Sequence, residues 1–267
     1  MPNLTPNSVL RYWVIQRHGS PSRKIYYDTL GSVSRMEYFL NQCIQDVHNF
    51  SPPGKRIPLA FDEWNLWDQS MRQLIQCNYN LRDGLWVASM LNLLHRVALD
   101  VPFANIAQMV NCIGIIWSEK DATFLTASGE VFRLYANHAG DKYLPAKVEC
   151  PEMPHKTALS VLDVSATRSG NRTILFFVNR HYDGAMDVTC DLQGITGKQN
   201  VQAWEIHHDN PVQYNTPQSP HEVAIREKKE DLSLTEEAGG VVLKIAMKAH
   251  SILCVELELE LDIVAEP

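Results

Sequence analysis

The stretch Leu59-Ala60-Phe61-Asp62-Glu63-Trp64-Asn65-Leu66-Trp67 decides the fold of this chain. Residues 56–61 follow a Pro-Pro-Gly turn and predict a short strand that stops at the carboxylate pair Asp62-Glu63. A carboxylate at the carboxyl end of a barrel strand, with aromatic rings beside it, suits sugar hydrolysis, because the rings stack on the sugar and the carboxylate attacks or stabilises the anomeric carbon. In the alternative interpretation, Asp62 or Glu63 caps a following helix and the tryptophans are core. The stretch alone leaves both interpretations open.

Length and composition predict a soluble globular protein. The 267 residues suffice for one large domain or two ordinary ones, and 45% hydrophobic with 21% charged residues is the usual globular balance. A net charge of −7 without a basic face argues against nucleic acid as a partner. The six cysteines are scattered, without a CxxC pair or zinc spacing, so we expect free thiols, no metal site and a reducing, cytoplasmic location. We find no signal peptide and no apolar run long enough to cross a membrane.

The first half of the chain alternates expected strands and helices. Three strands, the last of them buried, are expected at residues 8–14, 56–61 and 103–110. Three helices with apolar residues at helical spacing are expected at residues 32–50, 82–98 and 128–138. A polar loop is expected over residues 16–28. The order strand, helix, strand indicates parallel βαβ units.

The second half of the chain has a different pattern. From about residue 146, apolar and polar residues alternate with period two, as at Met186, Val188, Cys190 and Leu192, at Val241, Leu243, Ile245 and Met247, and at Leu253, Val255, Leu257 and Leu259. This pattern predicts an antiparallel β-sandwich or jelly roll. We therefore expect two domains, residues 1–145 and residues 146–267.

Several motifs in order carry a resemblance to a known family. After residues 61–67 come Tyr79-Asn80-Leu81-Arg82-Asp83-Gly84-Leu85, then Ala104-Asn105-Ile106-Ala107-Gln108-Met109-Val110-Asn111, and weaker matches at Val131-Phe132-Arg133-Leu134-Tyr135, Val178-Asn179-Arg180 and Tyr214-Asn215-Thr216-Pro217. These motifs are similar to those of glycoside hydrolase family 51, the α-L-arabinofuranosidases. The resemblance implies a retaining glycosidase on a (β/α)8 TIM barrel followed by a jelly roll, with no metal or organic cofactor and a tendency to form homo-oligomers.

The resemblance also implies roles for four residues. Glu63 matches the catalytic nucleophile, and Trp67, Gln108 and Tyr12 match substrate-contacting residues, with Tyr12 beside the nucleophile. Chemically, Tyr12 can donate to the Glu63 carboxylate and hold it ionised, and Gln108 offers a donor and an acceptor to sugar hydroxyls. Equally, Tyr12 can be plain core and Gln108 can satisfy buried backbone groups. Alternation along a strand places Asp62 and Glu63 on opposite faces, so we expect that they do not form the catalytic pair.

The second catalytic carboxylate has no match in the sequence. A retaining glycosidase needs a general acid/base about 5–5.5 Å from the nucleophile. In the family it follows an asparagine at the end of an earlier strand, but no Asn-Glu pair precedes Glu63, where the acids are Asp28 in the expected loop and Glu37 and Asp46 on the expected helix. Leu10 stands where the family has a histidine. Because a full barrel needs eight βα units over about 250 residues, we expect only about the last three units, and little or no activity of the chain alone.

Three functions remain open at this stage. The first is the C-terminal part of an α-L-arabinofuranosidase that releases terminal arabinofuranosyl residues from arabinan or arabinoxylan by double displacement. The second is a non-catalytic carbohydrate-binding or assembly module. The third is a β-xylosidase or endoglucanase on the same scaffold, because subsite residues rather than the fold select the sugar. The expected partner is an arabinose-containing oligosaccharide or polysaccharide, without nucleic acid or membrane.

Overall fold

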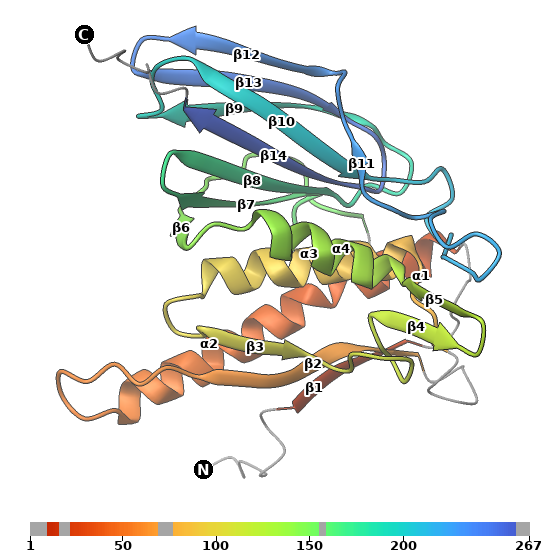
Figure 1. Cartoon of the computed structure of the whole chain (residues 1–267). Helices are drawn as coiled ribbons and strands as arrows, with labels where there is room; N and C mark the ends of the chain where they lie inside the picture. Colours follow the sequence, from red (N-terminus) through yellow and green to blue (C-terminus); the bar gives the residue numbers. More distant parts are fainter. Residues whose placement is uncertain (1–9, 16–21, 69–76, 155–158, 260–267) are drawn as a thin grey trace, which may run out of the picture.

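The computed structural model describes residues 10–15, 22–68, 77–154 and 159–259. Helices separate a small parallel sheet from a larger antiparallel sandwich (Figure 1). The first half contains, in order, β1 (Leu10–Ile15), α1 (Arg23–Gly31), α2 (Val33–Phe50), β2 (Ala60–Asp68), α3 (Leu81–Arg96), β3 (Phe103–Ile106), β4 (Ile116–Glu119), β5 (Ala122–Leu125) and α4 (Ala127–His138). The second half contains β6 (Lys142–Leu144), β7 (Leu162–Ser169), β8 (Arg172–Asn179), β9 (Met186–Gln193), β10 (Gln199–Ile206), β11 (Arg226–Glu227), β12 (Leu232–Glu237), β13 (Gly240–Met247) and β14 (Ser251–Leu259).

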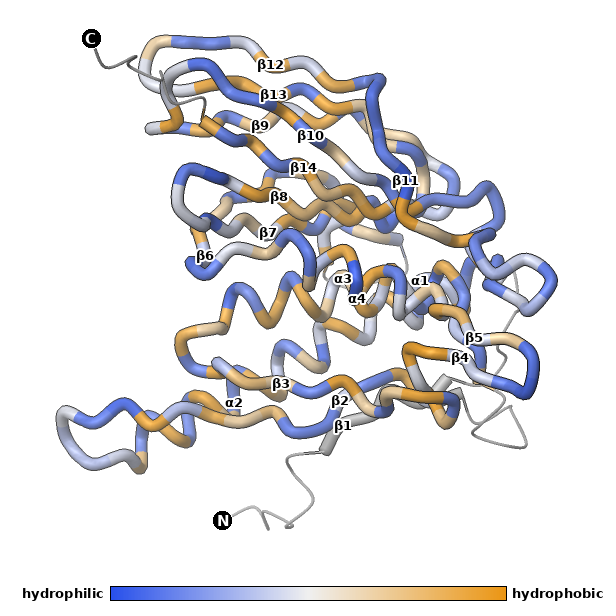
Figure 2. The backbone as a smooth tube through the Cα atoms, in the orientation of Figure 1, coloured by the Kyte–Doolittle hydropathy of each residue, from blue (hydrophilic) through white to orange (hydrophobic). Residues whose placement is uncertain are grey.

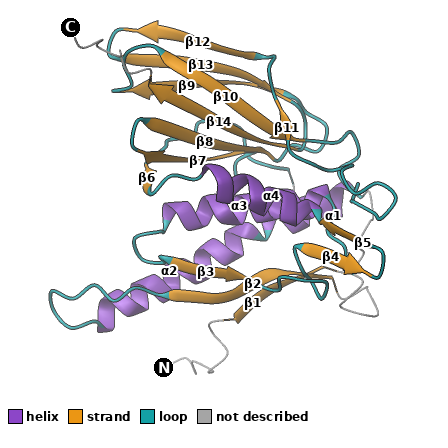
Figure 3. Cartoon of the chain, viewed as in Figure 1, coloured by secondary structure: helices purple, strands orange, loops and turns teal. Residues whose placement is uncertain are grey.

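The small sheet has the order β1-β2-β3 with every pair parallel. The helices gather on one of its faces, and α3 and α4 pack side by side between this sheet and the sandwich (Figures 1 and 3). Phe61 and Trp64 of β2 share one hydrophobic core with Leu30 of α1 and Leu40 of α2. The expected order of parallel strands joined by helices is therefore confirmed for the described residues.

Helix α1 corrects the expected polar loop at residues 16–28. Its second half buries Tyr26, Tyr27 and Leu30, while Lys24 and Asp28 pair on the exposed side at 2.5 Å. The polar residues masked an amphipathic helix only nine residues long, which is too short for hydrophobic periodicity to identify. Residues 16–21 lie outside the described residues.

Two of the expected strands also differ from the structure. β2 does not stop at the carboxylate pair but continues to Asp68. The buried strand expected at residues 103–110 ends at Ile106. Its first residue, Phe103, is 55% exposed. In β3, Ala104 and Ile106 pack on the helix-side core while Phe103 and Asn105 do not. The apolar run resembled a doubly covered strand, but only one face of β3 is covered.

The second half is the expected antiparallel sandwich. One sheet has the order β11-β10-β14-β8-β7-β6 and the other the order β12-β13-β9. β8 and β14 are apolar along most of their length (Figure 2), because alternate residues enter different cores. Phe176 packs toward the helices, whereas Phe177 packs between the two sheets.

The two halves share a continuous hydrophobic core. The larger core joins residues of α1, α3 and β2 to residues of β8 and β14. The first strand of the sandwich, β6, precedes residue 146 and pairs with β7. The expected division into two domains, residues 1–145 and residues 146–267, stays a prediction. All six cysteines are free thiols, and no helix among the described residues has the length and hydropathy to cross a membrane.

Candidate active site

The strand β2 carries a bulge at Asp62 and Glu63. Between Phe61 and Trp64 the register advances by three residues on β2 but by two on β3, so Asp62 and Glu63 both lie opposite Asn105. Phe61 and Trp64 both pack against the helices, so regular alternation is interrupted between them. The expectation that Asp62 and Glu63 point to opposite faces assumed a regular strand, which the bulge interrupts, so that expectation stays a prediction. Bulges commonly redirect side chains beside functional sites.

Glu63 is half-buried, while its neighbour Asp62 is exposed. On β1, Leu10 pairs with Glu63 and Tyr12 pairs with Asn65, two positions further along β2. The side chain of Tyr12 lies outside what the structure describes, so its hydrogen bond to Glu63 stays a prediction. The helix-cap alternative for Asp62 and Glu63 is wrong, because both residues lie within a strand.

The predicted sugar-binding glutamine lies in the Gln108 loop, residues 107–115, between β3 and β4. Gln108 is exposed and follows the end of β3 rather than lying in a strand. The backbone N–H of Ala107 donates to the carbonyl of Trp64 at 3.1 Å. Because Trp64 is the residue after Glu63, the loop begins beside the strand segment that carries Glu63. The structure therefore brings Glu63 and Gln108 to the same end of the sheet.

Asn65 is a site residue that the sequence analysis did not single out. Its side chain is fully buried, and its Nδ2 donates to the carbonyls of Ala107 and of Ile113, the latter at 2.8 Å. Its Oδ1 accepts from the N–H of Leu66 at 2.7 Å. One signal was present in the sequence: asparagine is disfavoured in strands, so an asparagine between two large apolar residues of a strand indicates hydrogen bonding to backbone groups.

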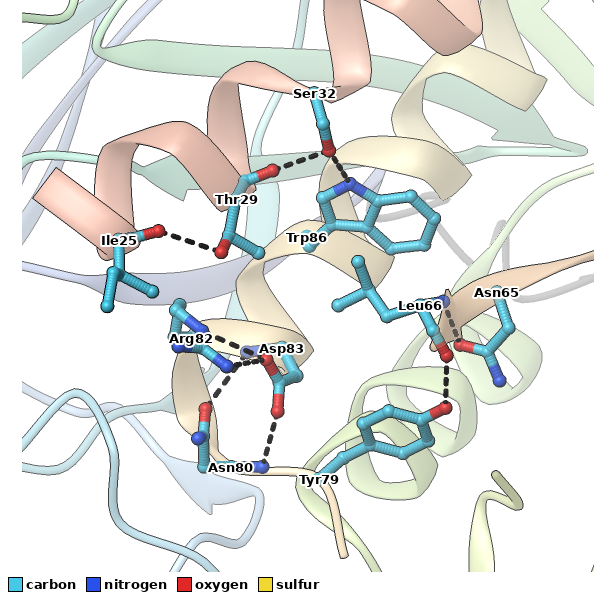
Figure 4. A network of polar contacts seen from close by, with 10 residues as sticks. All are labelled: Ile25, Thr29, Ser32, Asn65, Leu66, Tyr79, Asn80, Arg82, Asp83 and Trp86. Atoms are coloured by element: carbon cyan, nitrogen blue, oxygen red, sulfur yellow. Dashed lines mark hydrogen bonds and ion pairs between the residues drawn. The ribbon is translucent and has the colours of Figure 1, made fainter. Parts of the chain in front are cut away.

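A hydrogen bond joins the carboxyl end of β2 to the segment just before α3 (Figure 4). The hydroxyl of Tyr79 donates to the carbonyl of Leu66 at 2.6 Å. Asn80 caps α3 in a reciprocal capping box with Asp83. The buried Arg82 guanidinium donates from Nε and Nη2 to Asp83 Oδ1 at 3.0 and 2.7 Å. The positive end of the helix dipole also favours the Asp83 carboxylate there.

The two tryptophans of the stretch differ in their surroundings. Trp64 is fully buried and its ring centroid lies 6.1 Å from that of Trp86 on α3. The Trp86 Nε1 donates to Ser32 Oγ at 2.8 Å, which ties α3 to the junction of α1 and α2 (Figure 4). The core interpretation therefore holds for Trp64. Trp67 is half-buried at the end of β2, with part of its surface packed on the core.

Cys77 and Tyr79, which precede α3, are buried and neutral. Burial raises the pKa of the Cys77 thiol to about 12. Burial also raises the pKa of Tyr79 well above its ordinary value. Both side chains therefore stay protonated at neutral pH.

The acids upstream of Asp62 do not lie on strands. Asp28 is in α1 rather than in a loop, and Glu37 and Asp46 lie on α2. A carboxylate at the end of a neighbouring barrel strand, the position expected for the acid/base, is therefore not provided by these three residues. Within the described part of the chain, no three His, Cys, Asp or Glu side chains are grouped so that they could hold a metal ion.

Comparison with known proteins identifies the family. A sequence model of the alpha-L-arabinofuranosidase C-terminal domain matches residues 62–251, which include Glu63, Trp67 and Gln108. The chain belongs to this family. The match begins at Asp62, so β1 and Tyr12 precede it. The resemblance inferred from the motifs is thereby confirmed.

Relatives of this arabinofuranosidase C-terminal chain are longer than the chain itself. An intracellular exo-alpha-L-arabinofuranosidase of Bacteroides ovatus is 28% identical over 242 residues, which are 87% of this chain and 46% of the relative. The alpha-L-arabinofuranosidase structure from Thermotoga maritima in complex with arabinose matches 92% of this chain and 52% of its own, with 28% identity and a TM-score of 0.76. A family 51 arabinofuranosidase from Xanthomonas axonopodis pv. citri shares the fold at 22% identity, with a TM-score of 0.79 over 92% of this chain and 52% of its own. The chain spans about half the length of these relatives.

Proposed function

We propose that this chain provides the nucleophile-bearing half of a retaining α-L-arabinofuranosidase. One observation carries the proposal. Glu63 lies in a bulge of a parallel strand, beside the start of the Gln108 loop, within the region that matches the family. The substrate would be a terminal arabinofuranosyl residue of arabinan or arabinoxylan. Free thiols support the cytoplasm as its location.

Glu63 acts as the nucleophile in the first displacement. One carboxylate oxygen forms a bond to the anomeric carbon, the bond from that carbon to the leaving oxygen breaks, and the electron pair stays on the leaving oxygen. A general acid must protonate that oxygen unless the leaving group is already a stable anion. In the second displacement, water attacks the anomeric carbon, a general base accepts a proton from that water, and the bond to the Glu63 carboxylate breaks with its electron pair staying on the carboxylate.

The remaining predicted residues bind the sugar. Gln108 is exposed at the start of its loop and offers donor and acceptor atoms to sugar hydroxyls. Trp67 provides an aromatic face further along β2. Tyr12 is proposed to donate to the Glu63 carboxylate from β1.

We infer that β1, β2 and β3 correspond to the last three units of a (β/α)8 barrel. Large apolar residues are exposed in this half, including Phe50 on α2, Leu99 after α3 and Phe103 on β3. The remaining barrel units would cover such a surface. They would also supply the general acid/base, for which the three upstream acids are wrongly placed.

Leaving-group dependence tests this proposal on the purified chain. If the nucleophile is present without the acid/base, a dinitrophenyl α-L-arabinofuranoside should release a burst of phenolate, whereas a methyl or oligosaccharide arabinofuranoside should not react. Glu63→Ala should abolish the burst, and Asp62→Ala is the matched control that should keep it. Added azide should restore turnover, because this small anion attacks the intermediate without needing a general base.

Two results would contradict the proposal. Robust turnover of the unactivated arabinofuranoside, lost in Glu63→Ala, would show that the chain carries a complete site. Binding of arabino-oligosaccharide without any burst would favour the non-catalytic module. A burst from xylosides or glucosides instead would favour the related activities on the same scaffold.

A further inference from the structure

Three asparagines in this chain share one bonding pattern. Each is fully buried, donates from Nδ2 to two backbone carbonyls and accepts one backbone N–H at Oδ1. They are Asn65, bonded to Ala107, Ile113 and Leu66; Asn179, bonded to Gly184, Lys248 and His181; and Asn215, bonded to Leu125 and twice to Val223. A carboxamide has two donor hydrogens, and this pattern uses both. The side chain thus joins separate backbone segments where no sheet ladder does.

Asn65 lies where β2 loses its pairing with β3, while its pairing with β1 continues to Asp68. The pairing of β2 with β3 ends at Trp64, yet β2 continues to Asp68. Asn65 is the next residue, and its two donor bonds reach carbonyls near both ends of the Gln108 loop. Its acceptor bond holds the N–H of Leu66 in the same strand. The Asn65 side chain therefore joins both ends of the loop to the strand that carries Glu63, next to the backbone bond from Ala107 to Trp64.

The loop needs such a fixed anchor because its own backbone is irregular. Asn111 and Ile113 adopt positive φ values of 56° and 50°. Its internal backbone bonds join Gln108 to Ile113 and Ile115 at 3.4 and 3.3 Å, and Asn111 to Gly114 at 2.7 Å. Asn111 also bonds to Ile116 at the start of β4, at 2.8 Å, so the Asn65 bonds hold the side of the loop that faces β2. Non-glycine residues in this backbone region persist where the surroundings hold them.

We propose that Asn65 is a positioning residue that sets Gln108 relative to Glu63. The inference rests on the proposed function for its catalytic consequence, although the mechanical part stands on the contacts alone. Asn65 does not touch the reacting atoms in this account. It acts through the loop, because a displacement of about 1 Å in a sugar-contacting group can cost on the order of 100-fold in rate.

Two variants of Asn65 separate its donor and acceptor roles. Asn65→Ala removes all three bonds. Asn65→Asp keeps the acceptor oxygen for Leu66 but places its other carboxylate oxygen, in place of the Nδ2 donor, against the two carbonyls. The matched controls are Asn179→Ala and Asn179→Asp, which remove the same kinds of side-chain-to-backbone hydrogen bonds within the sandwich. Hydrogen exchange of residues 107–115 and the burst with dinitrophenyl α-L-arabinofuranoside are measured for all four variants.

The proposal expects faster exchange in the Gln108 loop for both Asn65 variants and unchanged exchange there for both Asn179 variants. It also expects the rate constant of the burst to fall by on the order of 10- to 100-fold for Asn65 variants only. A merely structural defect would lower the burst amplitude through loss of folded protein but would leave its rate constant unchanged.

The outcomes distinguish the inference from the proposed function. If the wild-type chain gives no burst, the proposed function and the catalytic role of Asn65 fail together, and loop exchange still decides the mechanical role. If the wild type gives a burst and Asn65→Asp matches it in rate and loop exchange, the inference is refuted while the proposed function stands. Slow bursts in both the Asn65 and Asn179 variants would also refute a specific positioning role.

Discussion

Replacing Asp163 by asparagine should destabilise the whole described structure, because Asp163 joins its two halves. Asp163 lies on β7 and is nearly buried. Its Oδ2 accepts from Asn92 at 3.1 Å and its Oδ1 accepts from Arg96 at 2.9 Å, both on α3. The buried Arg180 guanidinium lies 3.9 Å from Oδ1. Asparagine keeps the shape of the side chain but removes the negative charge that Asp163 places beside Arg96 and Arg180.

The magnitude follows from the environment of each partner. Removing one member of a buried charge pair costs about 3–5 kcal/mol. Arg96 keeps 28% of its side chain exposed and can regain water, and the Arg180 contact is too long for a hydrogen bond. Burial lowers the pKa of Arg180, and the Asp163 charge opposes that effect. We therefore expect Asp163→Asn to lower the free energy of unfolding by about 2–4 kcal/mol.

Urea unfolding measures this change. Tryptophan fluorescence and far-ultraviolet circular dichroism should give the same midpoint for the wild type, and both should shift together in Asp163→Asn. Asp187→Asn, which neutralises an exposed carboxylate on β9, is the control and should change stability by less than about 0.5 kcal/mol. Equal effects of the two substitutions, or two separated transitions in the wild type, would refute the view that one cooperative core includes both halves.

Two further predictions concern buried groups. Burial lowers the pKa of His95 to about 4, below the ordinary value of 6.5, so the unfolded chain binds a proton that the folded chain does not. The free energy of unfolding should therefore fall as pH falls from 6.5 to about 4, by up to about 1.4 kcal/mol per pH unit from His95. Burial also lowers the pKa of His207 to about 4. His95→Gln should therefore reduce the slope of stability against pH, measured by urea melts, to the part due to His207, and an unchanged slope would contradict this. Gly129→Ala should cost about 1–3 kcal/mol, because a Cβ there would lie 2.1 Å from the Ile115 carbonyl oxygen. At Gly84 an added Cβ would lie 3.3 Å from the buried Val131 side chain and 3.4 Å from the Ala127 carbonyl oxygen. These contacts are less severe, so Gly84→Ala should cost less in the same melts, and equal losses would argue against the tight backbone contact at Gly129.

The sequence predicted the order of elements well where the hydrophobic pattern was long. The helices α2 and α3 and the strands β13 and β14 lie within a few residues of the expected bounds. These elements bury regular faces, so period and packing agree. Helix α1 was missed because its exposed polar residues dominate a short segment. The β4–β5 hairpin was missed because four-residue strands carry too few alternations to detect.

The candidate site shows where sequence patterns stop being informative. The position of Glu63 on a strand could be predicted, but the bulge that interrupts alternation at Asp62 and Glu63 depends on register with β3. Gln108 was recognised as a candidate, yet it lies in an irregular loop whose carbonyls at Ala107 and Ile113 accept hydrogen bonds from the distant Asn65. Such features follow from long-range pairing, which no local window contains.

The position of a trapped sugar tests the central claim most directly. After reaction of the purified chain with dinitrophenyl α-L-arabinofuranoside and acid quenching, mass spectrometry of the digested protein locates any arabinosyl ester. Because deglycosylation needs a general base that the upstream acids do not provide, the ester should accumulate. The account predicts one arabinosyl group on Glu63 in the wild type and none in Glu63→Gln. Labelling of another residue, labelling that survives in Glu63→Gln, or no labelling at all would contradict it.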